Sequence, residues 1–144
     1  MTSSLTMTKA NREAFLAALH VGVLAVADDS GGAPVAVPVW YRYEPGGDVV
    51  MSLGTDGVKT RLLAASARAT LCAQQEDLPY AFVSVDGPVR IDARDEEERA
   101  RLATRYLGEL APRYLEATAS EQTVTVRLTP ERWRTQDYAQ LPDF

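Results

Sequence analysis

The chain has 144 residues, a length that fits one domain with a single hydrophobic core and excludes a multidomain enzyme. Fifteen lysines and arginines against twenty acidic residues give a net charge of −5, which argues against nucleic acid as a main partner. A single cysteine, Cys72, and a single histidine, His20, exclude an intrachain disulfide and a cysteine- or histidine-rich metal site, so no bound metal is expected.

Residues 1–9 lack the basic and apolar regions of a secretory signal. No apolar stretch reaches the roughly twenty residues that a membrane-crossing helix needs. We therefore expect a cytoplasmic protein without a membrane partner.

The chain is predicted to open with a short amphipathic helix. Thr8 can cap it, and Phe15, Leu16 and Leu19 share one face. Residues 21–27 then form a near-continuous apolar run that ends in Asp-Asp-Ser-Gly-Gly, which is strong turn chemistry. This pattern predicts a buried strand followed by a hairpin.

The second strand of that hairpin is predicted within residues 34–43, where valines alternate on one face. Pro34 and Pro38 cannot donate to a sheet ladder and so favour an edge position or a bulge. A Glu-Pro-Gly-Gly-Asp turn leads to a strand at residues 49–53 and then to a short helix at residues 59–65.

Residues 68–75 and 80–85 are predicted as two further strands. The Asp86-Gly87 pair is the best type I′ hairpin signal in the chain, which places the partner strand at residues 88–92. The sequence therefore predicts a tight turn at Asp86-Gly87.

The charged block at residues 95–105 has acidic side chains three and four positions before Arg101, which is typical of a solvated helix. Residues 123–129 alternate cleanly and are predicted as the last strand. Six or seven short strands with three helices indicate a mainly β protein, an antiparallel β barrel with peripheral helices, formed as one domain over residues 1–144.

No motif for side-chain chemistry is present. A Ser-His-Asp set is not available with one early histidine, and the chain has no Gly-x-Ser-x-Gly turn, phosphate-binding P-loop or Gly-x-Gly-x-x-Gly fingerprint. Catalytic residues cannot be assigned from the sequence. Any chemistry is most simply supplied by a bound organic cofactor.

The segment after the strand at residues 49–53 is a candidate phosphate site. Thr55, Gly57, Lys59, Thr60 and Arg61 combine hydroxyls, backbone N–H groups at a helix start and positive charge. A polar strand-to-helix connection with a solvated lysine fits the same pattern.

Four other residues are candidates for contacts to a planar ring. Trp40 can wall a flat heterocycle, although a core or interface role fits it as well. Gln74 and Gln75 suit amide contacts to ring carbonyls and equally suit an exposed strand end. Tyr80 can place a phenol near a ligand or be an ordinary half-buried tyrosine.

The order of these elements resembles the flavin/deazaflavin oxidoreductases known as pyridoxamine 5′-phosphate oxidase-like proteins. The resemblance spans nearly the whole chain, and it implies their fold, an antiparallel FMN-binding split barrel. The matching segments are the opening helix, the run before the Gly-Gly turn, Pro38-Val39-Trp40-Tyr41, and residues 49–53, 55–59, 69–73, 80–87 and 123–133.

The resemblance also implies a homodimer with the cofactor in a groove between the subunits. Thr55 and Lys59 would hold its phosphate together with Thr60 or Arg61. The residues expected to flank the ring system are Pro38, Val39 and Trp40, with Gln74, Gln75 and Tyr80 along the same groove.

The length and the C-terminal sequence of the chain argue against vitamin B6 oxidation. True pyridoxamine phosphate oxidases are longer and end in an Arg-Leu-x-Pro type tail, whereas Gln140 precedes Leu141 here. The short chain with one strong cation is more similar to the subgroup that uses the deazaflavin coenzyme F-420, with FMN as the alternative cofactor.

The resemblance implies a reductase that passes a hydride from the reduced cofactor to a small electrophilic substrate such as an enone, quinone or tetrapyrrole. A proton would come from water, Tyr41 or Tyr80. Two alternatives remain open: a non-catalytic carrier or sensor that holds a flavin or tetrapyrrole in the same groove, and a subunit with an empty groove whose role is association.

Overall fold

The computed structural model describes residues 5–142. The expectation about a secretory signal falls partly on residues 1–4, which lie outside this range. No helix among the described residues is long and apolar enough to cross a membrane.

The helices are α1 (Lys9–Ala17), α2 (Val58–Ser66), α3 (Glu96–Leu107) and α4 (Ala111–Ala117), with single 3-10 turns at Gly108–Leu110 and Tyr138–Gln140. The strands are β1 (Gly22–Val26), β2 (Val35–Val39), β3 (Arg42–Tyr43), β4 (Val49–Gly54), β5 (Arg68–Gln75), β6 (Ala81–Ala93), β7 (Thr123–Leu128) and β8 (Arg132–Asp137).

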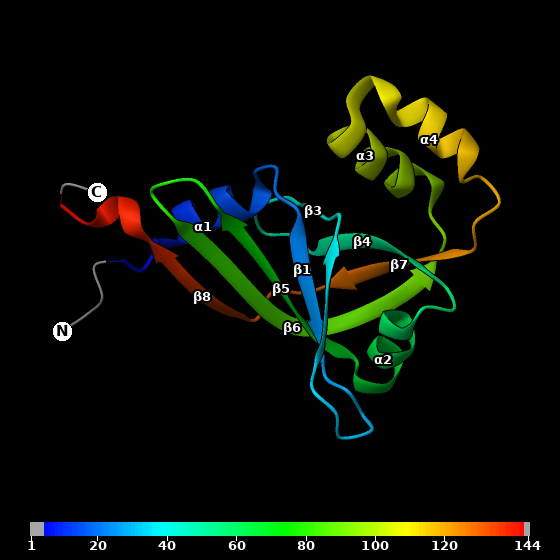
Figure 1. Cartoon of the computed structure of the whole chain (residues 1–144), viewed down its shortest axis with the longest axis horizontal. Helices are drawn as coiled ribbons and strands as arrows, with labels where there is room; N and C mark the ends of the chain where they lie inside the picture. The colour runs from blue at the N-terminus through cyan, green and yellow to red at the C-terminus, as the bar shows by residue number, and fades with distance from the viewer. Residues whose placement is uncertain (1–4, 143–144) are drawn as a thin grey trace.

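The strands form one curled antiparallel sheet in the order β2-β1-β5-β6-β7-β4-β3, with β8 added on β6. The 13-residue strand β6 pairs with β5 and β8 through its first half and with β7 through its second half, so it runs through both halves of the fold (Figure 1). The predicted split barrel with peripheral helices is confirmed. The part of the chain that the structure describes has eight strands, rather than six or seven.

The predicted hairpin at Asp86-Gly87 is wrong, because β6 continues straight through it. Gly87 pairs with Ala69 of β5 inside the strand. A Cβ atom at Gly87 would lie 1.8 Å from the backbone oxygen of Thr129, where the chain crosses from β7 to β8. Backbone hydrogen bonds hold this crossing on both sides, from Thr129 N–H to the Pro88 oxygen and from Glu131 N–H to the Asp86 oxygen. The glycine therefore marks a close backbone approach and not a turn.

The prediction that residues 123–129 form the last strand is wrong. Strand β8 follows β7 and pairs with the first half of β6, where Trp133 lies opposite Val85. Its sequence is Arg-Trp-Arg-Thr-Gln-Asp, so it lacks the apolar alternation by which half-buried strands are recognised.

The edge position predicted from the prolines is confirmed, because β2 is the terminal strand of the sheet and Pro38 lies opposite Val23 of β1. The predicted burial of the first strand is only half right. Residues of β1 alternate between the core and the surface, and the Val23 side chain is 40% exposed.

The predicted opening helix is confirmed as α1, with the Thr8 hydroxyl accepting the Asn11 N–H at 3.1 Å. Leu16 is fully buried, but Leu19 lies beyond the end of the helix and is exposed, contrary to the prediction. Tyr41 is the largest fully buried side chain, and its hydroxyl donates to the Leu16 oxygen at 2.7 Å. This bond fixes α1 against the barrel core.

The charged helix predicted at residues 95–105 is confirmed as α3, but it is not simply solvated. Glu98 is buried and accepts hydrogen bonds from Arg42 at 2.8 Å from Nη2 and 3.1 Å from Nε. Arg99 is 5% exposed. Both residues face inward because α3 packs on β4 and on α4, a helix that the sequence analysis missed. The α3–α4 pair lies at the opposite end of the molecule from the end of β8 (Figure 1).

Candidate functional site

A cavity of about 450 Å³ lies where the end of β2, strand β4, the start of α2 and helix α4 meet. Four of the ten predicted site residues contribute to its wall: Pro38, Val39, Trp40 and Lys59. The structure thus brings an aromatic part of the predicted site, the strand end with Trp40, together with a cationic part, Lys59. The rest of the wall comes from Val21, Ser52, Leu53, Gly54 and Tyr114.

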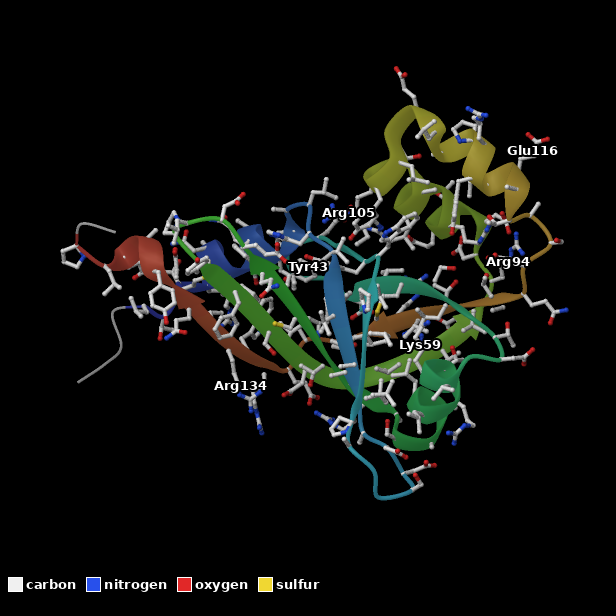
Figure 2. The ribbon with its side chains drawn as sticks, in the orientation of Figure 1. Tyr43, Lys59, Arg94, Arg105, Glu116 and Arg134 are labelled. Atoms are coloured by element: carbon white, nitrogen blue, oxygen red, sulfur yellow. The ribbon has the colours of Figure 1, made fainter. Side chains whose placement is uncertain are left out.

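Lys59 is the second residue of α2 and is half-buried. Gly57 is the N-cap with an extended backbone, and no side chain of residues 5–142 forms a capping hydrogen bond to the helix. Lys59 is the residue of α2 that lines the cavity, so the start of the helix lies next to it, and Figure 2 labels Lys59 beside α2. Uncapped N–H groups, the positive end of the helix dipole and an ammonium group form a donor set that suits a phosphate.

The other residues of the predicted phosphate site do not line the cavity. Thr60 is buried, and its hydroxyl donates to the Gly54 oxygen at 2.6 Å, which fixes the loop before α2. The guanidinium of Arg61 is exposed and faces Asp29 at 3.7 Å. Thr55 is exposed, and its N–H donates to the Gln122 oxygen. Lys59 alone of this group reaches the wall.

Trp40 is held by two tyrosines that the sequence analysis did not connect with it. Its ring stacks on Tyr106 of α3 with centroids 5.0 Å apart and planes 9° from parallel. Tyr114 of α4 approaches the indole at 5.4 Å and 51°. Because the α3–α4 pair supplies both rings, it sets the orientation of the aromatic wall. The sequence carried no local signal for this contact, which joins residues more than sixty positions apart.

The Tyr106 hydroxyl also fixes the crossover from β2 to β3. It accepts the Tyr41 N–H at 3.0 Å and donates to the His20 oxygen at 2.6 Å. Beside it, Arg105 donates to the Ala18 oxygen at the end of α1, as Figure 2 shows by its place between α3 and α1. Removal of the hydroxyl would leave at least one of these backbone groups without its partner.

We expect Tyr106→Phe to lower the free energy of unfolding by about 1–3 kcal/mol, the cost of unsatisfied buried polar groups. Tyr114→Phe is the matched control, because it keeps a ring beside Trp40, and it should change stability by less than about 0.5 kcal/mol. Urea unfolding of both variants measures the difference. Equal losses in the two variants would contradict the role given to the Tyr106 hydroxyl.

Gln74, Gln75 and Tyr80 lie outside the cavity wall. Gln74 is exposed at the end of β5. The Gln75 amide donates to the Pro79 oxygen at 2.8 Å and so closes the loop between β5 and β6. Tyr80 is half exposed at the start of β6. Within one subunit these residues do not join the four that surround the cavity.

A smaller cavity of about 100 Å³ adjoins the first one. The two share Trp40, Ser52, Gly54 and Tyr114 in their walls. Its remaining wall comes from α3 and from the start of β7 and includes the buried Arg99. No sequence signal pointed to this site, because Arg99 stands in a block of charges that is typical of a solvated helix.

Comparison with known proteins gives the same architecture. Rv2991, a conserved hypothetical protein from Mycobacterium tuberculosis, has a TM-score of 0.78 at 22% identity, covering 99% of this chain and 94% of that one. An F420 reductase has a TM-score of 0.63 at 17% identity (85% and 94% covered). A FAD-binding protein from Mesorhizobium loti has a TM-score of 0.60 at 20% identity (91% and 93% covered). At these low sequence identities the structural similarity establishes the fold alone. No curated protein sequence matches the chain.

The family comparison is decisive. The model of the pyridoxamine 5′-phosphate oxidase family matches residues 8–137, which run from the cap of α1 to the last residue of β8. The match includes every strand and every α-helix among the described residues. The chain therefore belongs to the pyridoxamine 5′-phosphate oxidase family.

Proposed function

We propose that this protein is a reductase that binds the deazaflavin coenzyme F-420, with FMN as the alternative cofactor, and reduces a small electrophilic organic molecule. One observation carries the proposal: a single cavity has Lys59, the second residue of α2, in one part of its wall and Trp40 in another. Family membership supports a flavin-related oxidoreductase. Two proteins of the same fold are named as an F420 reductase and a FAD-binding protein, which supports this class of cofactor.

The wall of the cavity fits such a cofactor. Lys59 and the α2 N–H groups would hold its phosphate, and Val39 and Trp40 would flank its ring system. The bound cofactor supplies the hydride. The chain supplies orientation, since Tyr106 and Tyr114 fix the indole against which the ring and the substrate would lie.

Of the two tyrosines considered as proton donors, Tyr41 does not fit. Its hydroxyl is buried and donates to the Leu16 oxygen, so its proton is already committed inside the core. Burial also raises the pKa of the Tyr41 phenol well above its ordinary value. Solvent remains as a proposed source, and Tyr80, which is half exposed and outside the cavity wall of its own subunit, would have to come from the second copy of the homodimer.

The proposed active unit is a homodimer whose second subunit covers the cavity. Val21 in the cavity wall is 54% exposed, and the exposed apolar side chains Val23 and Val58 lie on β1 and α2, the elements beside it. Exposed apolar side chains of this kind favour burial against a partner. A second copy would also bring further side chains to a cavity that one chain leaves open.

The proposal is tested by fluorescence titration with F-420 and, separately, with FMN, followed by turnover of the reduced cofactor with menadione as a quinone acceptor. We expect F-420 to bind at least tenfold more tightly than FMN and its reduced form to be consumed. Tighter FMN binding would replace the cofactor assignment. Binding without consumption across enones, quinones and tetrapyrroles would indicate a carrier, and no binding of either cofactor would refute the proposal.

A further inference from the structure

Arg99 places a buried guanidinium in the wall of the smaller cavity. Its Nη2 donates to the Thr118 hydroxyl at 2.8 Å, but Nη1 is buried and has no hydrogen-bond partner among the described residues. The nearest carboxylate oxygen to Nη1 belongs to Glu96, at 3.5 Å. That carboxylate is two-thirds exposed and already accepts a hydrogen bond from Arg94 Nε. The charge of Arg99 is thus only partly compensated.

A second residue in the wall of the same cavity also has an unpartnered polar atom. The hydroxyl oxygen of Thr123, the first residue of β7, is buried and forms no hydrogen bond in the described part of the chain. Buried polar atoms are rarely left without partners, because each one costs about 1–3 kcal/mol. Here the wall of one small cavity contains both a cationic residue and a hydroxyl residue with an unpartnered polar atom. Their common complement is an oxygen anion such as a carboxylate, which accepts charge-assisted hydrogen bonds from a guanidinium.

The position of this cavity links it to the larger one. A molecule lying against Trp40 in the larger cavity can extend a substituent past Ser52 towards Arg99, since Trp40 and Ser52 line both cavities and Arg99 lines the smaller one. A volume of about 100 Å³ admits a carboxylate group, whereas a ring would stay in the larger cavity. Glu121 contributes an opposing charge to the wall, but it is exposed and therefore screened by solvent, unlike Arg99.

We propose that the Arg99 cavity is a subsite for a carboxylate of the substrate, so that the substrate class is a small unsaturated or aromatic carboxylic acid. This inference rests on the proposed function for the identity of the reaction. The binding of the carboxylate itself requires only Arg99 and Thr123. The subsite and the cofactor site can therefore be tested separately.

The test is a calorimetric titration of the full chain, without added cofactor, with benzoate and with its neutral analogue benzamide. We expect benzoate to bind at least tenfold more tightly than benzamide and Arg99→Met to remove that preference. Arg113→Met on the exposed face of α4 is the matched control and should bind benzoate like the wild type. Equal binding of the two probes, no benzoate binding, or full binding by Arg99→Met would each overturn the proposal.

Arg99→Met also removes the bond to Thr118, so a second variant guards against misfolding. Thr123→Val keeps the shape of the side chain and should weaken benzoate binding at least threefold, while unchanged affinity would count against the subsite. Titration of Arg99→Met with F-420 and FMN separates the two sources of a carboxylate. Unchanged cofactor affinity supports a substrate group, and weakened affinity would assign the cavity to the cofactor instead. Selective benzoate binding by a protein that binds neither cofactor would refute only the proposed function.

Discussion

Replacement of Lys59 by alanine is expected to weaken cofactor binding by about 10- to 100-fold, because a hydrogen bond to a charged group contributes about 1.5–3 kcal/mol. Lys59 is half-buried in the cavity wall, where its charge is screened less than on an open surface. The start of α2 stays in place in the variant, since Thr60 still anchors the preceding loop to Gly54. A residual affinity from the helix N–H groups is therefore expected. Fluorescence titration of the variant with F-420 and FMN measures the loss.

The chain contains one other lysine, which provides a matched control. Lys9 lies at the start of α1, beside a different cavity formed with Tyr43 and Trp133. Lys9→Ala removes the same charge and should leave cofactor affinity within about twofold, because a distant exposed charge is screened by solvent. Equal weakening of cofactor binding in both variants would show that the net charge of the protein determines the affinity, and not the position of Lys59 in the cavity. Unchanged affinity in Lys59→Ala would remove the phosphate site from α2.

The parts of the site that could be predicted are those encoded by neighbouring residues. The strand β4, the loop with Gly57 and the lysine at the start of α2 form one local pattern of alternation, turn and helix start. Pro38 likewise signalled an edge strand by its missing N–H. In both cases one short segment contains the whole physical reason for the structure.

The parts that could not be predicted depend on contacts between distant segments. The pairing of Trp40 with Tyr106 and Tyr114 requires the α3–α4 pair to fold over the end of the sheet. The burial of Arg99 depends on Thr118 and on the strand β7 that follows it. A pattern of charges at helical spacing does not tell which side of the helix will be covered. Aromatic support and the second cavity were therefore invisible in the sequence.

Gly87→Ala is expected to destabilise the protein by about 3 kcal/mol or more, at or above the upper range for overpacked cores. A methyl group there would lie 1.8 Å from the Thr129 oxygen and 3.3 Å from the Glu131 nitrogen, and both are backbone atoms. They cannot rotate away as a flexible side chain could. Relief requires the β7–β8 crossing to move, which would break the hydrogen bonds from Thr129 and Glu131 to the Pro88 and Asp86 oxygens of β6. Urea unfolding monitored by circular dichroism measures the change.

Gly54→Ala is the control for the general effect of removing a glycine from a strand. Gly54 ends β4, and a Cβ atom there would have no neighbouring atom within 4 Å in the described part of the chain, so the stability of the variant should change by less than about 1 kcal/mol. A further variant, Gly87→Asn, distinguishes the type I′ turn predicted at Asp86-Gly87 from the continuous strand with a close backbone crossing. In a type I′ turn the glycine would need only its positive φ, so Gly87→Asn would be tolerated. In the crossing seen here asparagine brings the same Cβ clash as alanine, and Gly87→Asn should be at least as unstable as Gly87→Ala.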